Sequence, residues 1–145
     1  MEKRIKNIES PALGCLLGTA YQTLLGKLGK ALKDASLDIT TSDYLVLRAI
    51  YSNEGLQQCE IAEMIGKDKA AVCRCVSGLE KKGLVKTVSI SHKCLKVFPS
   101  QRGLEIKERI LGIAQLRHDA LLDLTTKEEL ATFIRVLEKI IESDS

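Results

Sequence analysis

The 145-residue chain has the size of one domain, and it is long enough to bury roughly 70% of its unfolded surface without a metal or disulfide to hold it together. Only 3% of its residues are aromatic and none is Trp, which argues against a platform that stacks single-stranded nucleic acid. The net charge of +3 is uneven, because residues 67–96 hold eight Lys or Arg and two acids, a local charge of +6. This asymmetry points to a polyanionic partner for that segment.

The five cysteines are an odd number with irregular spacing: Cys15, Cys59, Cys73, Cys75 and Cys94. We expect them to be thiols in a reducing compartment rather than a disulfide framework. No apolar stretch has the length of a membrane span or of a signal peptide, so we expect a cytoplasmic protein that does not bind membranes.

The first predicted helix covers about residues 11–35, where apolar residues recur at helical spacing and Pro11 suits the first turn. Four glycines interrupt it, each at a cost of about 1 kcal/mol relative to Ala in a helix interior. Packing must therefore hold this helix, and close approach of another backbone is one explanation. The four are Gly14, Gly18, Gly26 and Gly29.

Three shorter helices follow. The first covers about residues 42–53, capped by Thr40, Thr41 or Ser42, and its apolar content predicts that it is mostly buried. A second covers about 57–65 and ends at Gly66, and Asp68 caps a third over about 68–82. The tight turn between the last two predicts a helix-turn-helix, whose second helix enters the major groove of DNA.

Two runs rich in β-branched residues, LVKTVSI and CLKVFPS, then predict a hairpin over about residues 84–99, in the position of a wing. A helix over about 101–121 and a last helix, capped at Thr125 or Thr126 and reaching about 143, complete the chain. The expected fold is therefore mainly α with a small β-hairpin wing. The DNA-binding lobe would cover about residues 42–99.

The cysteines at 73 and 75 lie on the third of the short helices, where residues two apart point roughly 200° apart. Cys73 and Cys75 therefore cannot bind one metal or reach each other. Cys75 falls on the apolar stripe and is interpreted as a small buried hydrophobe. The opposite stripe includes Ala70, Cys73, Arg74 and Ser77.

This outer stripe suits groove reading, because Arg can donate two hydrogen bonds to guanine and an Ala methyl can pack on that of thymine. A solvated helix face is the alternative. The tight turn and the basic segment favour base contacts by Ala70, Cys73, Arg74 and Ser77, with the hairpin tip, His92 and Lys93, at the wing. The phosphate contacts would be Lys67, Lys69, Lys81, Lys82 and Lys86.

The order of elements, with the motifs LDITTSDYLVLRAI, EIAEMIGKDKAAV and LEKKGLV and the S-x-x-G pair at 100 and 103, resembles the MarR family of winged helix-turn-helix transcription regulators. The resemblance covers nearly the whole chain, residues 1–145, as one domain. It implies a homodimer held by helices over about 11–35 and 101–143, with recognition helices in successive major grooves and wings over the minor groove. It also implies that a small ligand or an oxidant releases the DNA.

Two alternatives stay open. Cys15 resembles the reactive cysteine of the peroxide-sensing branch of the family, although Leu13, Leu16 and Leu17 around it suggest burial. Family members usually carry Ser or Thr where this chain has Ala70 and Ala71, and an Asp-x-Arg-Arg motif in the wing that this chain lacks. A winged helix that binds protein instead of DNA is therefore the second alternative.

An enzyme is not expected, and no cofactor or metal is predicted. The chain has two histidines, no Gly-rich phosphate loop and no metal-spaced Cys/His set. His118, beside Arg117 and Asp119, is interpreted as part of a solvated helix face.

Overall fold

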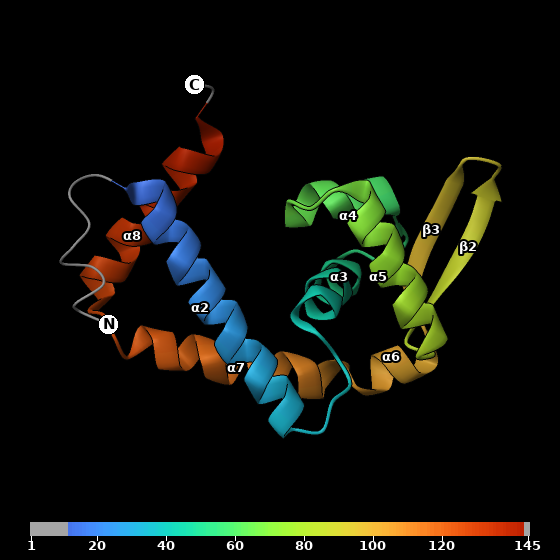
Figure 1. The fold of residues 1–145 in the computed structure, drawn as a ribbon, viewed down its shortest axis with the longest axis horizontal. Helices are drawn as coiled ribbons and strands as arrows, with labels where there is room; N and C mark the ends of the chain where they lie inside the picture. The colour runs from blue at the N-terminus through green and yellow to red at the C-terminus, as the bar shows by residue number, and fades with distance from the viewer. Residues whose placement is uncertain (1–11, 144–145) are drawn as a thin grey trace.

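The computed structural model describes residues 12–143, and its helices with one small antiparallel sheet confirm the predicted fold class (Figure 1). Helices α2 and α8 lie on one side of the molecule and α3 to α6 with the sheet on the other, and α7 runs along the bottom of Figure 1 from one side to the other. The bounds are α2 Leu13–Asp34, α3 Thr41–Ser52, β1 Leu56–Gln57, α4 Gln58–Ile65, α5 Lys69–Lys81, β2 Val85–Ser91, β3 Cys94–Pro99, α6 Gln101–Glu105, α7 Lys107–Leu122 and α8 Lys127–Glu142.

Helix α3 lies at the centre of the core, as its apolar content predicted. The Thr40 hydroxyl accepts from the Asp43 N–H at 3.0 Å and the Asp43 carboxylate accepts from the Thr40 N–H at 3.1 Å, which forms a capping box. Apolar residues of α3 pack with those of α4, α5, the sheet and α7 into one cluster. The helix therefore begins through a local cap and is held by burial on several sides.

The sheet contains one strand that the sequence analysis did not predict. Its order is β1-β3-β2, and the two-residue strand β1 pairs antiparallel with β3, with Leu56 opposite Val97. The predicted hairpin is confirmed as β2 and β3, which turn at His92 and Lys93. A strand of two residues is too short to show an alternating pattern in the sequence, so it can be recognised only by its pairing with β3 in the structure.

The predicted single helix over about 101–121 is wrong, because it is divided at Ile106 into α6 and α7. The Tyr51 hydroxyl donates to the Gly103 carbonyl at 2.6 Å, and that carbonyl is the acceptor a continuous helix offers to the Lys107 N–H. A Cβ at Gly103 would lie 2.1 Å from the Leu84 carbonyl oxygen. The helix therefore breaks where Tyr51 of α3 takes one of its carbonyl acceptors and where the Leu84 backbone packs closely against Gly103.

The close approach of another backbone that was one explanation for the glycines of α2 is not seen within this chain. Only Gly29 meets another element, where a Cβ would lie 3.1 Å from Thr41 Cγ2. A Cβ at Gly14, Gly18 or Gly26 would meet nothing within 4 Å, so those three glycines do not mark a close approach within one chain. The predicted place of Pro11 in the first turn lies outside the described residues.

Helix α8 has the predicted capping box, Thr126 with Glu129, but none of its residues is buried. Large apolar side chains stay exposed along it, including Phe133, Ile134, Ile140 and Ile141. Such a stripe on a surface helix is typical of a helix that packs against something else.

Replacing Gly103 tests the close contact. We expect Gly103→Ala to lower the free energy of unfolding by about 1–3 kcal/mol, because the methyl group would overlap the Leu84 carbonyl. Gly112→Ala is the matched control, since a Cβ there meets nothing within 4 Å, and it should raise stability by about 0.5–1 kcal/mol. Urea unfolding at one protein concentration measures both. Equal effects of the two variants would contradict the contact.

Candidate nucleic-acid interface and adjoining cleft

Helices α4 and α5 meet across a turn of three residues, as the sequence predicted. Gly66 ends α4 with φ +69°, a left-handed conformation that glycine adopts without strain. Asp68 caps α5, because its carboxylate accepts from the Ala71 N–H at 2.7 Å. This geometry forms a helix-turn-helix with α5 as its second helix.

The two faces of α5 divide as the periodicity predicted. Val72, Val76 and Leu79 are almost completely buried in the core. The opposite face is exposed along its length and has no acidic side chain between its first turn and Ser77. Its exposed residues are Ala70, Cys73, Arg74, Ser77 and Lys81.

The predicted wing also has an exposed tip. His92 and Lys93 both lie at the surface where β2 turns into β3. Lys93 lines a small hollow of about 80 Å³ together with Lys69, at the start of α5. The structure therefore brings the wing tip close to the N-terminus of the second helix.

The predicted phosphate contacts separate into two groups. Lys67, Lys69, Lys81 and Lys86 are exposed. Lys82 departs from the prediction, because its ammonium donates to the Asp43 carboxylate at 2.9 Å and to the Asp38 carbonyl at 2.8 Å. The side chain of Lys82 is thus held, partly exposed, as a bridge from the end of α5 to the start of α3.

The interpretation of Cys75 as a simple hydrophobe also needs correction. It is only partly buried, and its thiol lies 3.2 Å from the second oxygen of Asp43, to which it donates. Burial raises the pKa of Cys75 to about 12, and the hydrogen bond to Asp43 adds to that effect. The thiol therefore stays protonated and remains a donor near neutral pH.

Asp43 is the common partner of both residues. Burial alone would raise the pKa of Asp43, but hydrogen bonds from Lys82, Thr40 and Cys75 outweigh burial and leave the pKa below its ordinary value. Conversely, burial alone would lower the pKa of Lys82, and Asp43 leaves it raised. Both groups are charged at neutral pH and form a partly buried ion pair.

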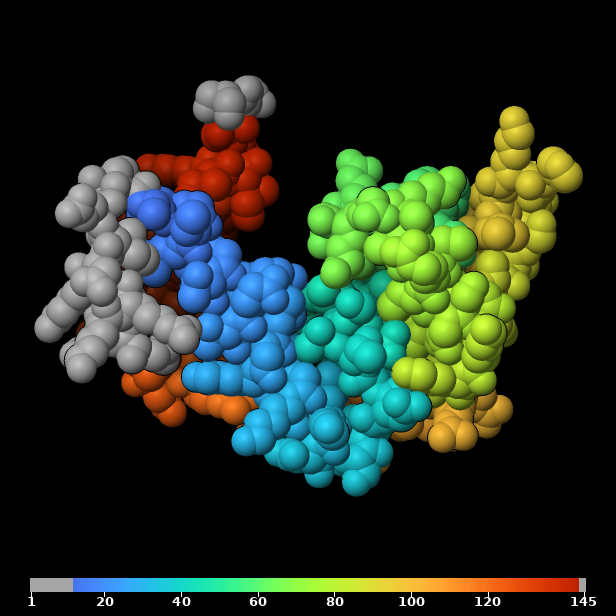
Figure 2. Space-filling view, viewed as in Figure 1, coloured from blue at the N-terminus to red at the C-terminus, as the bar shows by residue number. Residues whose placement is uncertain are grey.

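A second feature is a cleft of about 650 Å³ between α2, α3 and α7. Figure 2 shows the molecule hollowed between the side that carries α2 and α8 and the lobe that contains α3 to α5. Leucines and the tyrosines Tyr21, Tyr44 and Tyr51 form much of its wall. Its fifteen lining residues include no Asp or Glu.

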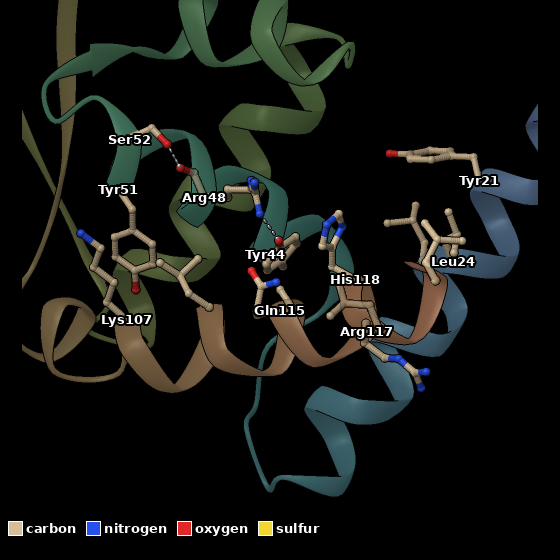
Figure 3. A pocket seen from close by; sticks show the side chains of 15 residues that line it. Tyr21, Leu24, Tyr44, Arg48, Tyr51, Ser52, Lys107, Gln115, Arg117 and His118 are labelled. Carbon is tan, nitrogen blue, oxygen red and sulfur yellow. Dashed lines mark hydrogen bonds between the residues drawn. The ribbon is translucent and has the colours of Figure 1, made fainter. Parts of the chain in front are cut away.

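The polar groups of the cleft are basic or neutral (Figure 3). Arg48 donates to the Tyr44 hydroxyl at 2.8 Å, and the Lys107 ammonium lies 5.5 Å from the centre of the Tyr51 ring. Arg117 and His118 are also among the lining residues: His118 points from α7 into the cleft, whereas the Arg117 guanidinium points away from it (Figure 3). His118 and Asp119 are exposed, as predicted for a solvated helix face. A cleft faced by two permanent cations, Arg48 and Lys107, with a histidine and apolar walls favours an anion that carries an apolar body.

The sequence analysis missed Asp43 and Arg48 as functional candidates. Asp43 follows the capping pattern of α3, which explains its local hydrogen bonds but gives no sign of partners 32 and 39 positions away. Arg48 is the single basic residue of α3, inside its apolar run, and that mismatch is the one available signal for a polar group at a cleft.

The other site predictions concern cysteines and metals. Cys15 is exposed in this chain, contrary to the burial that its leucine neighbours suggested, and its redox role stays a prediction. Among residues 12–143, no group of three or more His, Cys, Asp or Glu is placed to hold a metal ion. Within the same range no helix is both long and apolar enough to cross a membrane.

Thiol labelling tests the state of Cys75. With iodoacetamide at neutral pH, we expect the exposed Cys59 and Cys73 to react first and Cys75 last, because only a thiolate attacks the reagent and Cys75 is held as a thiol. Mass spectrometry of the digested protein gives the rates. In urea the difference should vanish. Labelling of Cys75 as fast as Cys73 in the folded protein would contradict the hydrogen bond.

Comparison with known proteins agrees with this geometry. Residues 37–93 match the sequence model of the MarR family. The HTH-type transcriptional regulator YybA of Bacillus subtilis strain 168 is 28% identical over 124 residues, which cover 80% of this chain and 83% of YybA.

Two solved structures are similar over nearly the whole chain. The oxidised form of MarR from E. coli is 26% identical, with 92% of this chain and 96% of that chain covered and a TM-score of 0.76. MepR of S. aureus, solved in complex with DNA, shares the fold at 20% identity, with a TM-score of 0.83 and coverage of 94% and 100%. With the helix-turn-helix, the wing and the long flanking helices, these matches make the chain similar to the MarR family of transcriptional regulators, in sequence over residues 37–93 and in fold over nearly its whole length.

Proposed function

We propose that the chain acts in the cytoplasm as a homodimeric regulator that binds double-stranded DNA in a sequence-specific manner, with α5 in the major groove and the wing near the minor groove. The observation that carries the proposal is the exposed face of α5, where Arg74 lies among small side chains at the centre of the basic segment. The MepR complex, which has the same fold, supports DNA as the ligand.

The exposed residues take separate roles in this proposal. Arg74 reads a base, because its planar guanidinium can donate two hydrogen bonds to guanine. Ala70, Cys73 and Ser77 contact the groove beside it, and His92 and Lys93 lie at the wing. The phosphate contacts are the lysines with exposed side chains: Lys67, Lys69, Lys81 and Lys86.

The dimer would use the exposed apolar face of α8 together with α2. Leu13, Leu16 and Leu24 on α2 are exposed, as are Phe133 and Ile140 on α8. A second copy would remove this apolar surface from water, which is the usual driving force of a permanent dimer. Two copies would also present two α5 helices to one face of the DNA.

The effector would occupy the cleft between α2, α3 and α7. We infer an organic anion, since Arg48 and Lys107 can neutralise a negative group while the leucine and tyrosine walls bury an apolar ring. Binding there would release the DNA, because α3 contributes to the cleft on one side and contacts α5 on the other.

Substitution of Arg74 tests the reading role. We expect Arg74→Ala to weaken binding to a specific duplex by about 1–3 kcal/mol while most binding to random duplex is retained. Arg74→Lys is the matched control, because it keeps the charge but lacks the planar pair of donors, so it should also lose specificity. Fluorescence anisotropy against both duplexes measures the difference. Equal losses on the two duplexes would remove Arg74 from base reading, and no binding at low salt would favour a protein-binding module.

A matched pair of small molecules tests the effector class. Benzoate should raise the melting temperature of the protein, because a ligand that binds only the folded state stabilises it, and neutral benzamide should do so much less. Arg48→Gln should reduce the benzoate effect, whereas Arg135→Gln, on α8 and outside the cleft, should not. Differential scanning fluorimetry gives the shifts. Equal shifts with benzamide would argue against an anion site.

A further inference from the structure

Asp43 is the single polar or charged residue that is buried among residues 12–143, with 7% of its surface exposed. Its carboxylate connects two helices that are distant in sequence, because it lies in the first turn of α3 and its partners Cys75 and Lys82 belong to α5 and its C-cap. One oxygen accepts from the Cys75 thiol at 3.2 Å and the other from the Lys82 ammonium at 2.9 Å.

These two contacts attach Asp43 to two different places on α5. Cys75 and Lys82 are seven residues apart, which is about two helical turns or roughly 10 Å along α5. Both contacts meet at the one carboxylate of Asp43, so they tie two places on α5 to a single anchor on α3 and limit how far the helix can turn about that anchor. Lys82 also donates to the Asp38 carbonyl at 2.8 Å, which ties the end of α5 to the segment before α3.

The apolar contacts of α5 do not provide this restraint by themselves. Val72, Val76 and Leu79 bury the inner face, but the hydrophobic effect has no directional preference. An ion pair with several hydrogen bonds does have one, although its net contribution to stability is small once the cost of burying the charges is included. The role of Asp43 therefore lies in geometry more than in stability.

We propose that Asp43 and Lys82 form a positioning pair that sets the orientation of α5, so that Lys82 influences base reading through Asp43 instead of by touching a phosphate. The inference rests on the proposed function, because it assumes that the exposed face of α5 reads DNA. It concerns two residues, of which Lys82 was predicted as a phosphate contact and Asp43 had no predicted role.

The neighbouring Lys81 gives a sharp control. Both side chains carry one positive charge at the same end of α5, but Lys81 is exposed and Lys82 is held by Asp43. We compare Lys81→Met with Lys82→Met by fluorescence anisotropy at several salt concentrations, far below the melting temperature. The duplexes are one that the wild-type protein has selected from a randomised pool and a random duplex of equal length.

A phosphate contact and a positioning residue give different results. Loss of a phosphate contact lowers affinity for both duplexes alike and reduces the salt slope by about 1, which we expect for Lys81→Met. For Lys82→Met we expect an unchanged salt slope and a ratio of specific to random affinity that falls on the order of tenfold, as for one poorly placed base contact. A reduced salt slope with an unchanged ratio for Lys82→Met would overturn the proposal.

Lys82→Met leaves Asp43 buried without its counter-ion. A second variant covers the case in which this substitution prevents folding. The double variant Asp43→Asn, Lys82→Met has no unpaired charge, and its ratio of specific to random affinity decides the question in the same way. A fallen ratio supports the positioning pair, and a ratio equal to that of the wild type overturns it. If the wild-type protein selects no duplex at all, the proposed function itself fails, which is a separate result.

Discussion

Burial of α3 is the constraint on which the rest of the structure depends. Seven of its twelve residues are buried, and both ends make polar contacts with distant parts of the chain, two at the start and one at the end. At its start, Asp43 holds α5 and Lys82, and at its end, Tyr51 donates to Gly103 and fixes where α6 gives way to α7. Helix α5 and the long helix α7 are thus both placed relative to one central helix.

The sequence predicted well those features that depend on neighbouring residues. The caps at Thr40, Asp68 and Thr126 and the two faces of α5 follow from local patterns, and so does the hairpin. Features that depend on distant partners were missed. The break at Ile106 needs Tyr51, which bonds across 52 positions, and the engagement of Lys82 needs Asp43, so neither could be derived from composition or periodicity.

Two exposed faces of the same chain differ in their chemistry and hence in what can cover them. The outer face of α5 combines small side chains with Arg74 and lies among lysines that remain solvated. The outer face of α8 presents large apolar side chains in a continuous stripe. A polyanion suits the first face and a second apolar helix suits the other, so the proposed DNA binding and the proposed self-association would use separate surfaces.

Helix α3 is also a wall of the cleft, through Tyr44 and Arg48, directly beside the residue that holds α5. A molecule in the cleft can alter DNA affinity only if it binds two arrangements of α3 with different strength. Such coupling is reciprocal, so DNA would weaken binding in the cleft by the same factor by which the occupant weakens DNA binding. The intracellular concentration needed to empty an operator would therefore exceed the dissociation constant measured for the protein without DNA.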